Sequence, residues 1–293
     1  MTQLRQRMLD AMVLRGLATR TQDSYVGAVA QLARHHHCSP EKLDSQQIQA
    51  YLLHLVQARH LARSSVNQAG CAFRFLYHTV LQRQEQVQIP LARAPQKLPE
   101  VLSRSELASL FASARHIKAR TVLMTAYGCG LRVSELCHLQ LADIDSHADR
   151  MFVRIAQGKG AKDRYVPLSG DVLQVLRFWW RVGRPQRWLF PAQTDAAKPL
   201  DVDSASRWYH AARTEAGITK QGGIHTLRHC YATHLLESGV DLHSLSQWLG
   251  HRHVSTTMRY VHLASPASPD GAQRSPLALL SALPERHSAN PLA

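Results

Sequence analysis

The sequence predicts a mainly helical α+β protein in which an N-terminal helical bundle is joined to a larger second domain. Three observations support this prediction. Apolar residues recur at helical spacing within residues 1–83, three prolines interrupt residues 84–100, and two short β-type runs stand inside a second helical region. At 293 residues the chain is long enough for two domains with separate cores.

The first domain, residues 1–83, is expected to form helices at roughly 3–15, 20–36, 45–59 and 64–82. One apolar stripe at helical spacing consists of Ile48, Tyr51, Leu52 and Leu55. A second stripe consists of Val66, Phe73, Leu76, Tyr77 and Val80. Ser45 is a candidate N-cap for the first stripe, and Ser64 or Ser65 for the second. Residues 84–96 are expected to be a linker.

The second domain is expected to span residues 97–264. Ser103 and Glu106 are spaced as a capping box at the start of its first helix. The runs at 151–155 and 164–168, separated by a Gly-containing turn, predict a β-hairpin. Helical segments are expected at 116–142, 171–184, 201–216 and 225–258. The remaining residues, 265–293, contain five prolines and the apolar run LALLSAL, which we expect to pack on its own domain or on a neighbouring protomer.

The chain is strongly basic. Lys and Arg total 35 against 21 Asp and Glu, which gives a net charge of +14 and a pI near 10.1. This excess suits a polyanion, because each phosphate that a cation neutralises releases counterions. DNA is the favoured partner, and RNA or an anionic membrane surface would also explain the charge. No apolar run is long enough to cross a bilayer and no signal-peptide core begins the chain, so a cytoplasmic location is expected.

Cysteine and histidine patterns indicate neither a disulfide framework nor a metal site. The five cysteines are widely spaced and form no C-x-x-C pair. The run His35-His36-His37-Cys38 places four ligand-type residues in succession, which would point around a helix in all directions. We therefore interpret this run as the end of a helix.

Three separate segments supply residue types suited to cleaving a phosphodiester. Guanidinium groups can hold non-bridging oxygens in a fork, a hydroxyl can attack, and acids and bases can move the protons. The candidates are Arg132, Lys159, His225, Arg228, His251 and Tyr260. Each has an ordinary interpretation as well: a surface arginine, a turn lysine, a core histidine or a packing tyrosine. Their order and spacing are more specific than any single residue.

These residues lie in segments that resemble the tyrosine recombinases, the phage-integrase and Xer-type group. The matching stretches are GCGLRVSELCHLQLADID, GKGAKDRYVPL, IHTLRHCYATHLLESG and LGHRHVSTTMRYVH. They match the family's arginine box, its hairpin lysine, its His-x-x-Arg box and its tyrosine box. The resemblance is strong over residues 97–263 and looser in the N-terminal helical domain.

The resemblance implies a site-specific recombinase that joins itself to DNA. Tyr260 would form a 3′-phosphotyrosyl link, while Arg132 and Arg228 would clamp the phosphate. Lys159 would protonate the leaving 5′-hydroxyl, His225 would assist proton transfer at the tyrosine, and His251 would hydrogen-bond the phosphate. No cofactor or metal is implied. The implied partners are double-stranded DNA, further protomers in a tetrameric synapse and accessory DNA-binding proteins.

Other functions remain open at this point. A catalytically silent DNA-binding protein on the same fold is disfavoured because all six reactive positions hold suitable residues. A strand-passage enzyme of the type IB topoisomerase kind shares the chemistry, and a metal-dependent tyrosine nuclease would need ligands near Tyr260. Integron integrases resemble the chain around His225, but they carry a helical insertion for which residues 189–224 leave little room.

Overall fold

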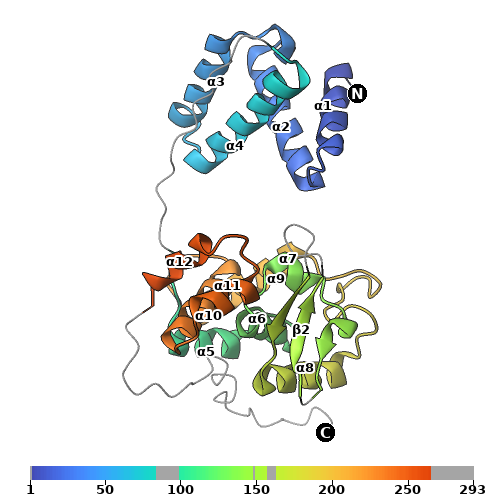
Figure 1. Ribbon diagram of the computed structural model, residues 1–293, viewed down its shortest axis with the longest axis vertical. Coiled ribbons are helices and arrows are strands. Elements are labelled where there is room, and N and C mark those ends of the chain that lie inside the picture. Colours follow the sequence, from blue (N-terminus) through green and yellow to red (C-terminus); the bar gives the residue numbers. More distant parts are fainter. Residues whose placement is uncertain (1, 84–98, 148, 157–162, 265–293) are drawn as a thin grey trace. The chain divides into compact units, whose positions relative to one another are not determined.

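The chain forms two compact units, Met1–Lys97 and Leu98–Ala293 (Figure 1). The computed structural model describes residues 2–83, 99–147, 149–156 and 163–264. It confirms a mainly helical fold with one small sheet. The predicted linker at 84–96 and the tail at 265–293 lie outside the described residues. None of the described helices is long and apolar enough to span a bilayer.

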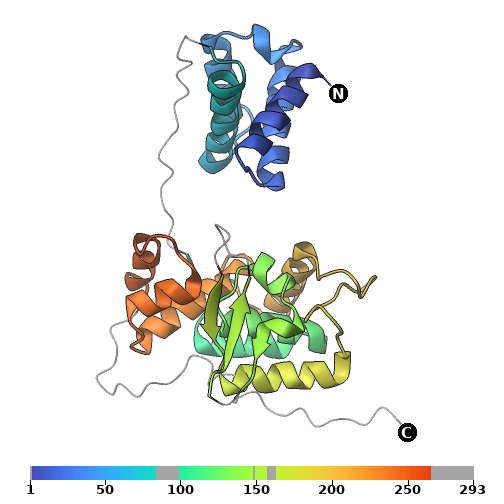
Figure 2. The same cartoon turned by 45° about the vertical axis from the view of Figure 1, so that its right-hand side comes forward.

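The first unit contains four α-helices in the predicted places (Figures 1 and 2). They are α1 (Gln3–Leu14), α2 (Thr19–His36), α3 (Ser45–Gln57) and α4 (Arg63–Arg74). A 3₁₀ turn, η1 (Pro40–Lys42), precedes α3, and a π-helical segment, η2 (Phe75–Val80), continues α4. Both predicted apolar stripes face one core that contains Ile48, Leu52, Phe73 and Leu76.

The expected caps of α3 and α4 were wrong. Asp44, one residue before the expected Ser45, caps α3, because its carboxylate accepts the N–H of Gln47 at 2.8 Å. The side-chain amide of Gln47 accepts the Asp44 N–H in return and completes a capping box. Ala62 precedes α4 and makes no side-chain cap bond. The histidine run does end α2, with His37 in the left-handed conformation at a φ of 51°.

The second unit surrounds a three-stranded antiparallel sheet with helices. Its strands are β1 (Ile144–Asp145), β2 (Phe152–Ile155) and β3 (Arg164–Pro167). The order is β1-β2-β3, with Ile144 opposite Val153 and Val153 opposite Val166. The helices are α5 (Arg104–Ser113), α6 (Ile117–Gly128), α7 (Val133–Cys137), α8 (Gly170–Gly183), α9 (Val202–Glu215), α10 (His225–Glu237), α11 (Leu242–Leu249) and α12 (Ser255–Val261).

Most predicted segments of this unit are confirmed, including the Ser103–Glu106 capping box and the hairpin. Two segments that were predicted as single helical stretches are each divided into several elements. The segment 116–142 divides into α6, α7 and a 3₁₀ turn, η3 (Leu141–Asp143), after which the short strand β1 begins. The segment 225–258 divides into α10, α11 and α12, because Gly239 and Gly250 adopt positive φ and end the first two helices.

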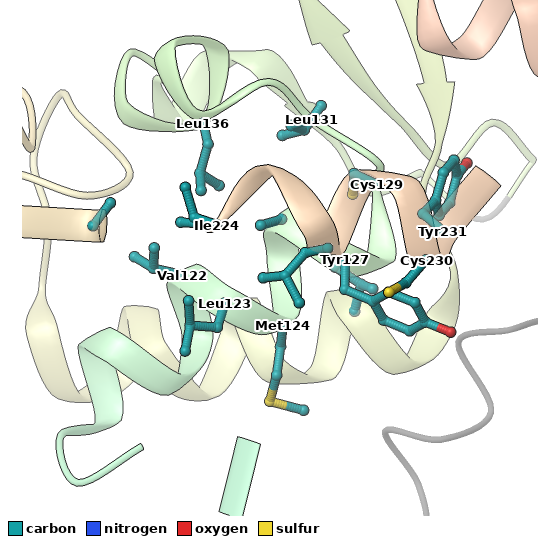
Figure 3. Close-up of a cluster of buried hydrophobic side chains, with 14 of the residues drawn as sticks. Val122, Leu123, Met124, Tyr127, Cys129, Leu131, Leu136, Ile224, Cys230 and Tyr231 are labelled. Carbon is teal, nitrogen blue, oxygen red and sulfur yellow. The ribbon is translucent and has the colours of Figure 1, made fainter. Parts of the chain in front are cut away.

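Two helices that are buried on nearly all sides form the centre of this unit. On α6 the buried side chains include Val122, Leu123 and Tyr127, and on α10 they include Cys230 and Tyr231 (Figure 3). A helix without a solvent face has no strong amphipathic period, and it is held by packing instead. Residues anchored on α6 and α10, or on the turn after α6, therefore have little freedom to move.

That turn depends on Gly130. Its φ of +58° lies in the left-handed region, and a Cβ atom there would come within 2.2 Å of the Tyr231 ring. Only glycine combines this backbone conformation with such close approach to α10. Because Arg132 follows two residues later, the tight turn also fixes where α7 begins.

We expect Gly130→Ala to lower the free energy of unfolding by about 2–5 kcal/mol, from backbone strain together with overpacking against Tyr231. Gly217→Ala is the matched control, since Gly217 has a similar φ of +67° but nothing within 4 Å of an added Cβ. The control should lose only about 1 kcal/mol. Urea denaturation of both variants measures the difference, and equal losses would contradict the packing argument.

Candidate active site

The candidate site forms where α7, β3 and the group α10–α12 meet. Figures 1 and 2 show α10, α11 and α12 grouped at one edge of the second unit, beside the sheet. Arg132 is the N-cap residue of α7, Arg164 begins β3 and Arg228 lies on α10. Tyr260 lies on α12. Residues far apart in the sequence are therefore positioned by rigid elements rather than by long loops.

The C-terminal end of α11 binds all three arginines through consecutive backbone carbonyls. The Trp248 carbonyl accepts from Arg164 Nε at 2.8 Å, and the Leu249 carbonyl accepts from an Arg228 terminal nitrogen. The Gly250 carbonyl accepts from Arg132 at 3.2 Å. The last carbonyls of a helix lack intrahelical partners and carry partial negative charge, so cations are favourable there. One helix end thus fixes three guanidinium groups.

The helix end itself is closed by a Schellman arrangement. The N–H groups of Gly250 and His251 donate to the carbonyls of Gln247 and Ser246, at 2.9 and 3.0 Å. Gly250 has a φ of +62°, and a Cβ atom there would meet the Arg164 side chain at 2.8 Å. Glycine at this position therefore allows both the helix ending and the approach of Arg164.

Glu135 is the carboxylate that joins two of these arginines. Arg164 donates to both of its oxygens at 2.8 and 2.7 Å, and Arg132 Nη1 donates to Oε1 at 2.7 Å. The backbone N–H of Arg132 donates to Oε2 at 2.9 Å, so Glu135 also caps α7. Burial opposes ionisation, but these bonds outweigh it and lower the pKa of Glu135 to about 2. Glu135 is therefore a permanent anion in the site.

Arg228 is a buried cation, with 2% of its surface exposed. Besides the Leu249 carbonyl, it donates to the Gly130 carbonyl at 2.7 Å and to His251 Nε2 at 3.2 Å. Burial, followed by repulsion from Arg132, lowers its pKa to about 10, which leaves it charged at neutral pH. It is positioned by the α6–α7 turn and by α11 at the same time.

The contacts of His251 define its tautomer. Arg228 has no acceptor, so Nε2 of His251 must accept, and Nδ1 then carries the proton donated to Thr257 Oγ1 at 2.7 Å. Burial and the neighbouring Arg228 lower the pKa of His251 to about 3. A neutral His251 therefore supports Arg228 while its ring stacks near Tyr260, with centroids 6.3 Å apart.

Tyr260 is buried, with 2% exposure, and its hydroxyl lies 3.0 Å from Nδ1 of His229. Burial raises the pKa of this phenol, while Arg228 and Arg259 act in the opposite direction. His225, the histidine expected to assist the tyrosine, is exposed and packs edge-on against the His229 ring at 4.8 Å. His229 therefore lies between His225 and the hydroxyl.

The structure brings together Arg132, Arg228, His251 and Tyr260. His225 contacts His229 and not the Tyr260 hydroxyl itself. Lys159 lies outside the described residues. Arg164 and His229 were not predicted as site residues from the sequence. The sequence did contain a signal for Arg164, because an arginine that faces inward from a hairpin needs a buried carboxylate as its partner. Among the described residues, no three His, Cys, Asp or Glu side chains gather as a metal site would require.

Comparison with known proteins identifies the family of the chain. Residues 100–266 match the phage integrase family, and residues 4–86 match the phage integrase N-terminal SAM-like domain. A putative integrase/recombinase of Sinorhizobium fredii is 39% identical over 267 residues, covering 90% of this chain and 86% of that protein. The tyrosine recombinase XerD of Staphylococcus aureus is 32% identical over 248 residues, covering 80% and 83%.

Among solved structures, a lambda integrase dimer bound to a COC′ core site has a TM-score of 0.70 at 18% identity, covering 86% of this chain and 95% of that one. This likeness concerns the fold. The two family matches and the relatives together define the class: this is a tyrosine-type site-specific DNA recombinase. The chain belongs to the phage integrase family.

The low pKa of Glu135 predicts that the free energy of unfolding depends on pH. Its carboxylate stabilises the fold fully above the unfolded-state pKa near 4.5, and this stabilisation is lost as the pH falls toward the folded-state pKa of about 2. The difference amounts to on the order of 3 kcal/mol. Urea denaturation at pH 3 and pH 6 should therefore show a smaller pH effect in Glu135→Gln, which is also less stable at pH 6.

Glu106→Gln is the control for this prediction. Glu106 pairs with Lys220 at 2.7 Å, but both side chains are considerably more exposed than Glu135. Solvent screens such a pair, so the control should change stability by less than about 1 kcal/mol. If Glu135→Gln behaved like Glu106→Gln, Glu135 would not be an anchor of the site.

Proposed function

We propose that the chain breaks and rejoins DNA strands through a covalent 3′-phosphotyrosyl link at Tyr260, with Arg132 and Arg228 as the phosphate clamp. The observation that carries the proposal is the joint anchoring of both guanidinium groups on the end of α11, next to the tyrosine hydroxyl. Fixed donors stabilise a phosphorane-like transition state because they need no reorganisation as charge develops. A chance surface arrangement would not bury a cation such as Arg228.

The hydrogen-bond inventory leaves room for a phosphate. A guanidinium has five N–H donors. Among the described residues, Arg228 donates to two carbonyls and to His251, and Arg132 donates to Glu135 and to one carbonyl. Two donors of Arg228 and three of Arg132 are then available for non-bridging oxygens. The hydrogen bonds to the protein orient each guanidinium group, and its remaining N–H groups would bind the phosphate.

The remaining candidates take supporting roles. Lys159, which lies outside the described residues, is proposed as the acid that protonates the leaving 5′-oxygen. His251 holds Arg228, and its proposed phosphate contact requires Nε2 to gain a proton, which an arriving negative charge favours. His225 is proposed to assist proton transfer through its contact with His229. These side chains supply the positive charge and the proton transfers that the reaction needs, so neither a cofactor nor a metal ion is proposed.

Double-stranded DNA is the proposed substrate and partner. Several matched structures are of recombinases bound to DNA, and two lambda integrase structures are described as dimers. A tetrameric synapse with accessory DNA-binding proteins, and exchange of the tail 265–293 between protomers, belong to this proposal. A catalytically silent protein on the same fold is not favoured, because the nucleophile and both arginines are held together.

The first unit is proposed to share in DNA binding, and one hollow on it suits a phosphate. This hollow, about 270 Å³, is lined by Gln31, Arg34, His35, Tyr51, His54 and Arg59, a set without any carboxylate. The hollow thus offers two guanidinium groups, those of Arg34 and Arg59, and no negative charge, which suits a DNA phosphate.

We expect Tyr260→Phe to bind DNA like the wild type and to form no covalent complex, since its ring keeps the packing but lacks the attacking oxygen. The substrate is nicked DNA from the regions that flank the gene, and denaturing gels detect the adduct. A parallel reaction with EDTA should retain the wild-type adduct. A persistent adduct in the variant, or loss of cleavage in EDTA that magnesium restores, would contradict the proposal.

We expect Arg132→Lys and Arg228→Lys each to reduce the cleavage rate by about 10²–10³-fold, because lysine keeps the charge but loses the planar fork. Arg115→Lys is the control, since Arg115 forms an exposed pair with Glu215 outside the site. Single-turnover cleavage measures the rates, and circular dichroism verifies folding. Wild-type cleavage by either folded site variant would place that arginine outside the clamp.

A further inference from the structure

The tyrosine hydroxyl has one protein hydrogen-bond partner among the described residues, and it is His229 rather than His225. Nδ1 of His229 lies 3.0 Å from the hydroxyl oxygen, and the two rings are tilted with centroids 5.6 Å apart. His229 is half-buried on α10, one turn after His225, and α12 packs Tyr260 against it. This contact joins the nucleophile to the same helix that carries Arg228.

We propose that His229 is a catalytic residue of this recombinase, which accepts the proton of Tyr260 as the hydroxyl attacks the scissile phosphate. The inference rests on the proposed function and deepens it. The O–H bond of the tyrosine breaks and its proton moves to Nδ1, while the phenolic oxygen forms a bond to phosphorus. The bond from phosphorus to the 5′-oxygen breaks, and that oxygen takes a proton from the acid proposed above, Lys159.

For this step His229 must begin neutral, with its proton on Nε2 and with Nδ1 free to accept. Burial, followed by repulsion from His225, Arg228 and Arg259, lowers its pKa to about 4. Among the described residues, these three and Tyr260 are the charged or titratable groups near it, and they lie on α10 and α12. At neutral pH the imidazole is therefore an acceptor, as a general base requires.

An imidazole with so low a pKa is a weak base, and substrate binding would raise the pKa of His229. The scissile phosphate would bring negative charge next to Arg228, one of the cations that disfavour protonated His229. Offsetting that charge raises the pKa of His229, because a nearby anion favours the charged imidazole. His229 is thus a poor base before DNA binds and a better one afterwards, which protects the tyrosine from ionising early.

The same helix contains a matched control. His234 also lies on α10, and its Nδ1 is also 3.0 Å from a tyrosine hydroxyl, that of Tyr127. Burial lowers the pKa of His234 to about 4, as it does for His229. His234 packs in the core with Tyr127, away from the nucleophile. The hydrogen-bond distance and the lowered histidine pKa are alike in the two pairs, whereas His234 is more deeply buried than His229 and its partner is a different tyrosine.

The test uses the full chain and the nicked DNA substrate on which wild-type adduct formation has been mapped. In His229→Asn the amide oxygen replaces Nδ1 as a hydrogen-bond acceptor, but it cannot take up the proton. We expect single-turnover cleavage to fall by about 10²–10⁴-fold at pH 7, with DNA binding unchanged. The rate of the variant should rise in proportion to hydroxide between pH 7 and pH 9, where the wild-type rate is flat.

A second substrate separates the base from the acid. If sulfur replaces the 5′-bridging oxygen, the leaving group departs without a proton, so a Lys159→Ala variant should recover while His229→Asn should not. His234→Asn should lower the melting temperature but keep the wild-type rate and pH profile. If His229→Asn fails to fold, by circular dichroism and DNA binding, His229→Gln takes its place with the same expectations.

Three results would overturn the inference while leaving the proposed function intact. The first is wild-type cleavage by His229→Asn, which would show that a hydrogen-bond acceptor is enough. The second is recovery of His229→Asn on the sulfur substrate, and the third is an equal loss in His234→Asn. If the wild-type chain itself formed no adduct, the proposed function would fail, and that result is distinguishable from the other three.

Discussion

The end of α11 is the feature on which the rest of the site depends. A helix terminus must satisfy its last carbonyl groups, and here a Schellman turn satisfies two while Trp248, Leu249 and Gly250 accept from three different arginines. The need of the helix for donors and the need of the arginines for acceptors are met by the same bonds. Any change that alters how α11 ends would therefore move all three guanidinium groups together.

This arrangement also explains how a small domain tolerates a buried cation such as Arg228. Removing a guanidinium from water is costly unless its N–H groups find acceptors. The Gly130 and Leu249 carbonyls provide them, and the partial negative charge of a helix end adds to the effect. Glu135 does the same for Arg132 and Arg164 with a full charge. The arginines are therefore in position before any substrate binds.

Much of this could be predicted from the sequence, and the failures have physical causes. Helices with an apolar stripe, such as α3, were predicted within two residues, because their period is set by burial on one face. The strand β1 was missed because two residues carry no period of their own. The single long helix predicted at 225–258 ignored Gly239 and Gly250, whose positive φ ends α10 and α11. Four of the candidate residues do lie close together in the structure, Arg132, Arg228, His251 and Tyr260, whereas Lys159 lies outside the described residues.

What spacing could not decide was which histidine meets the tyrosine. His225 and His229 are four residues apart, so any helix places them on the same side, and the sequence pattern favoured His225 because it stands in His-x-x-Arg. His234 even makes the same kind of contact with a different tyrosine. The choice is made by where α12 lies against α10, which is a matter of tertiary packing.

The charge of the site links its parts to one another. The carboxylate of Glu135 binds Arg132 and Arg164, while Arg228 is held by carbonyl groups and His251, so these four side chains carry two positive charges in excess. That excess attracts a phosphate, and Arg228 adds to the burial that keeps His229 and His251 neutral. A bound phosphodiester would satisfy the arginines and make both imidazoles more basic in the same event. Substrate binding and proton transfer are therefore coupled through electrostatics, and this coupling requires no conformational change.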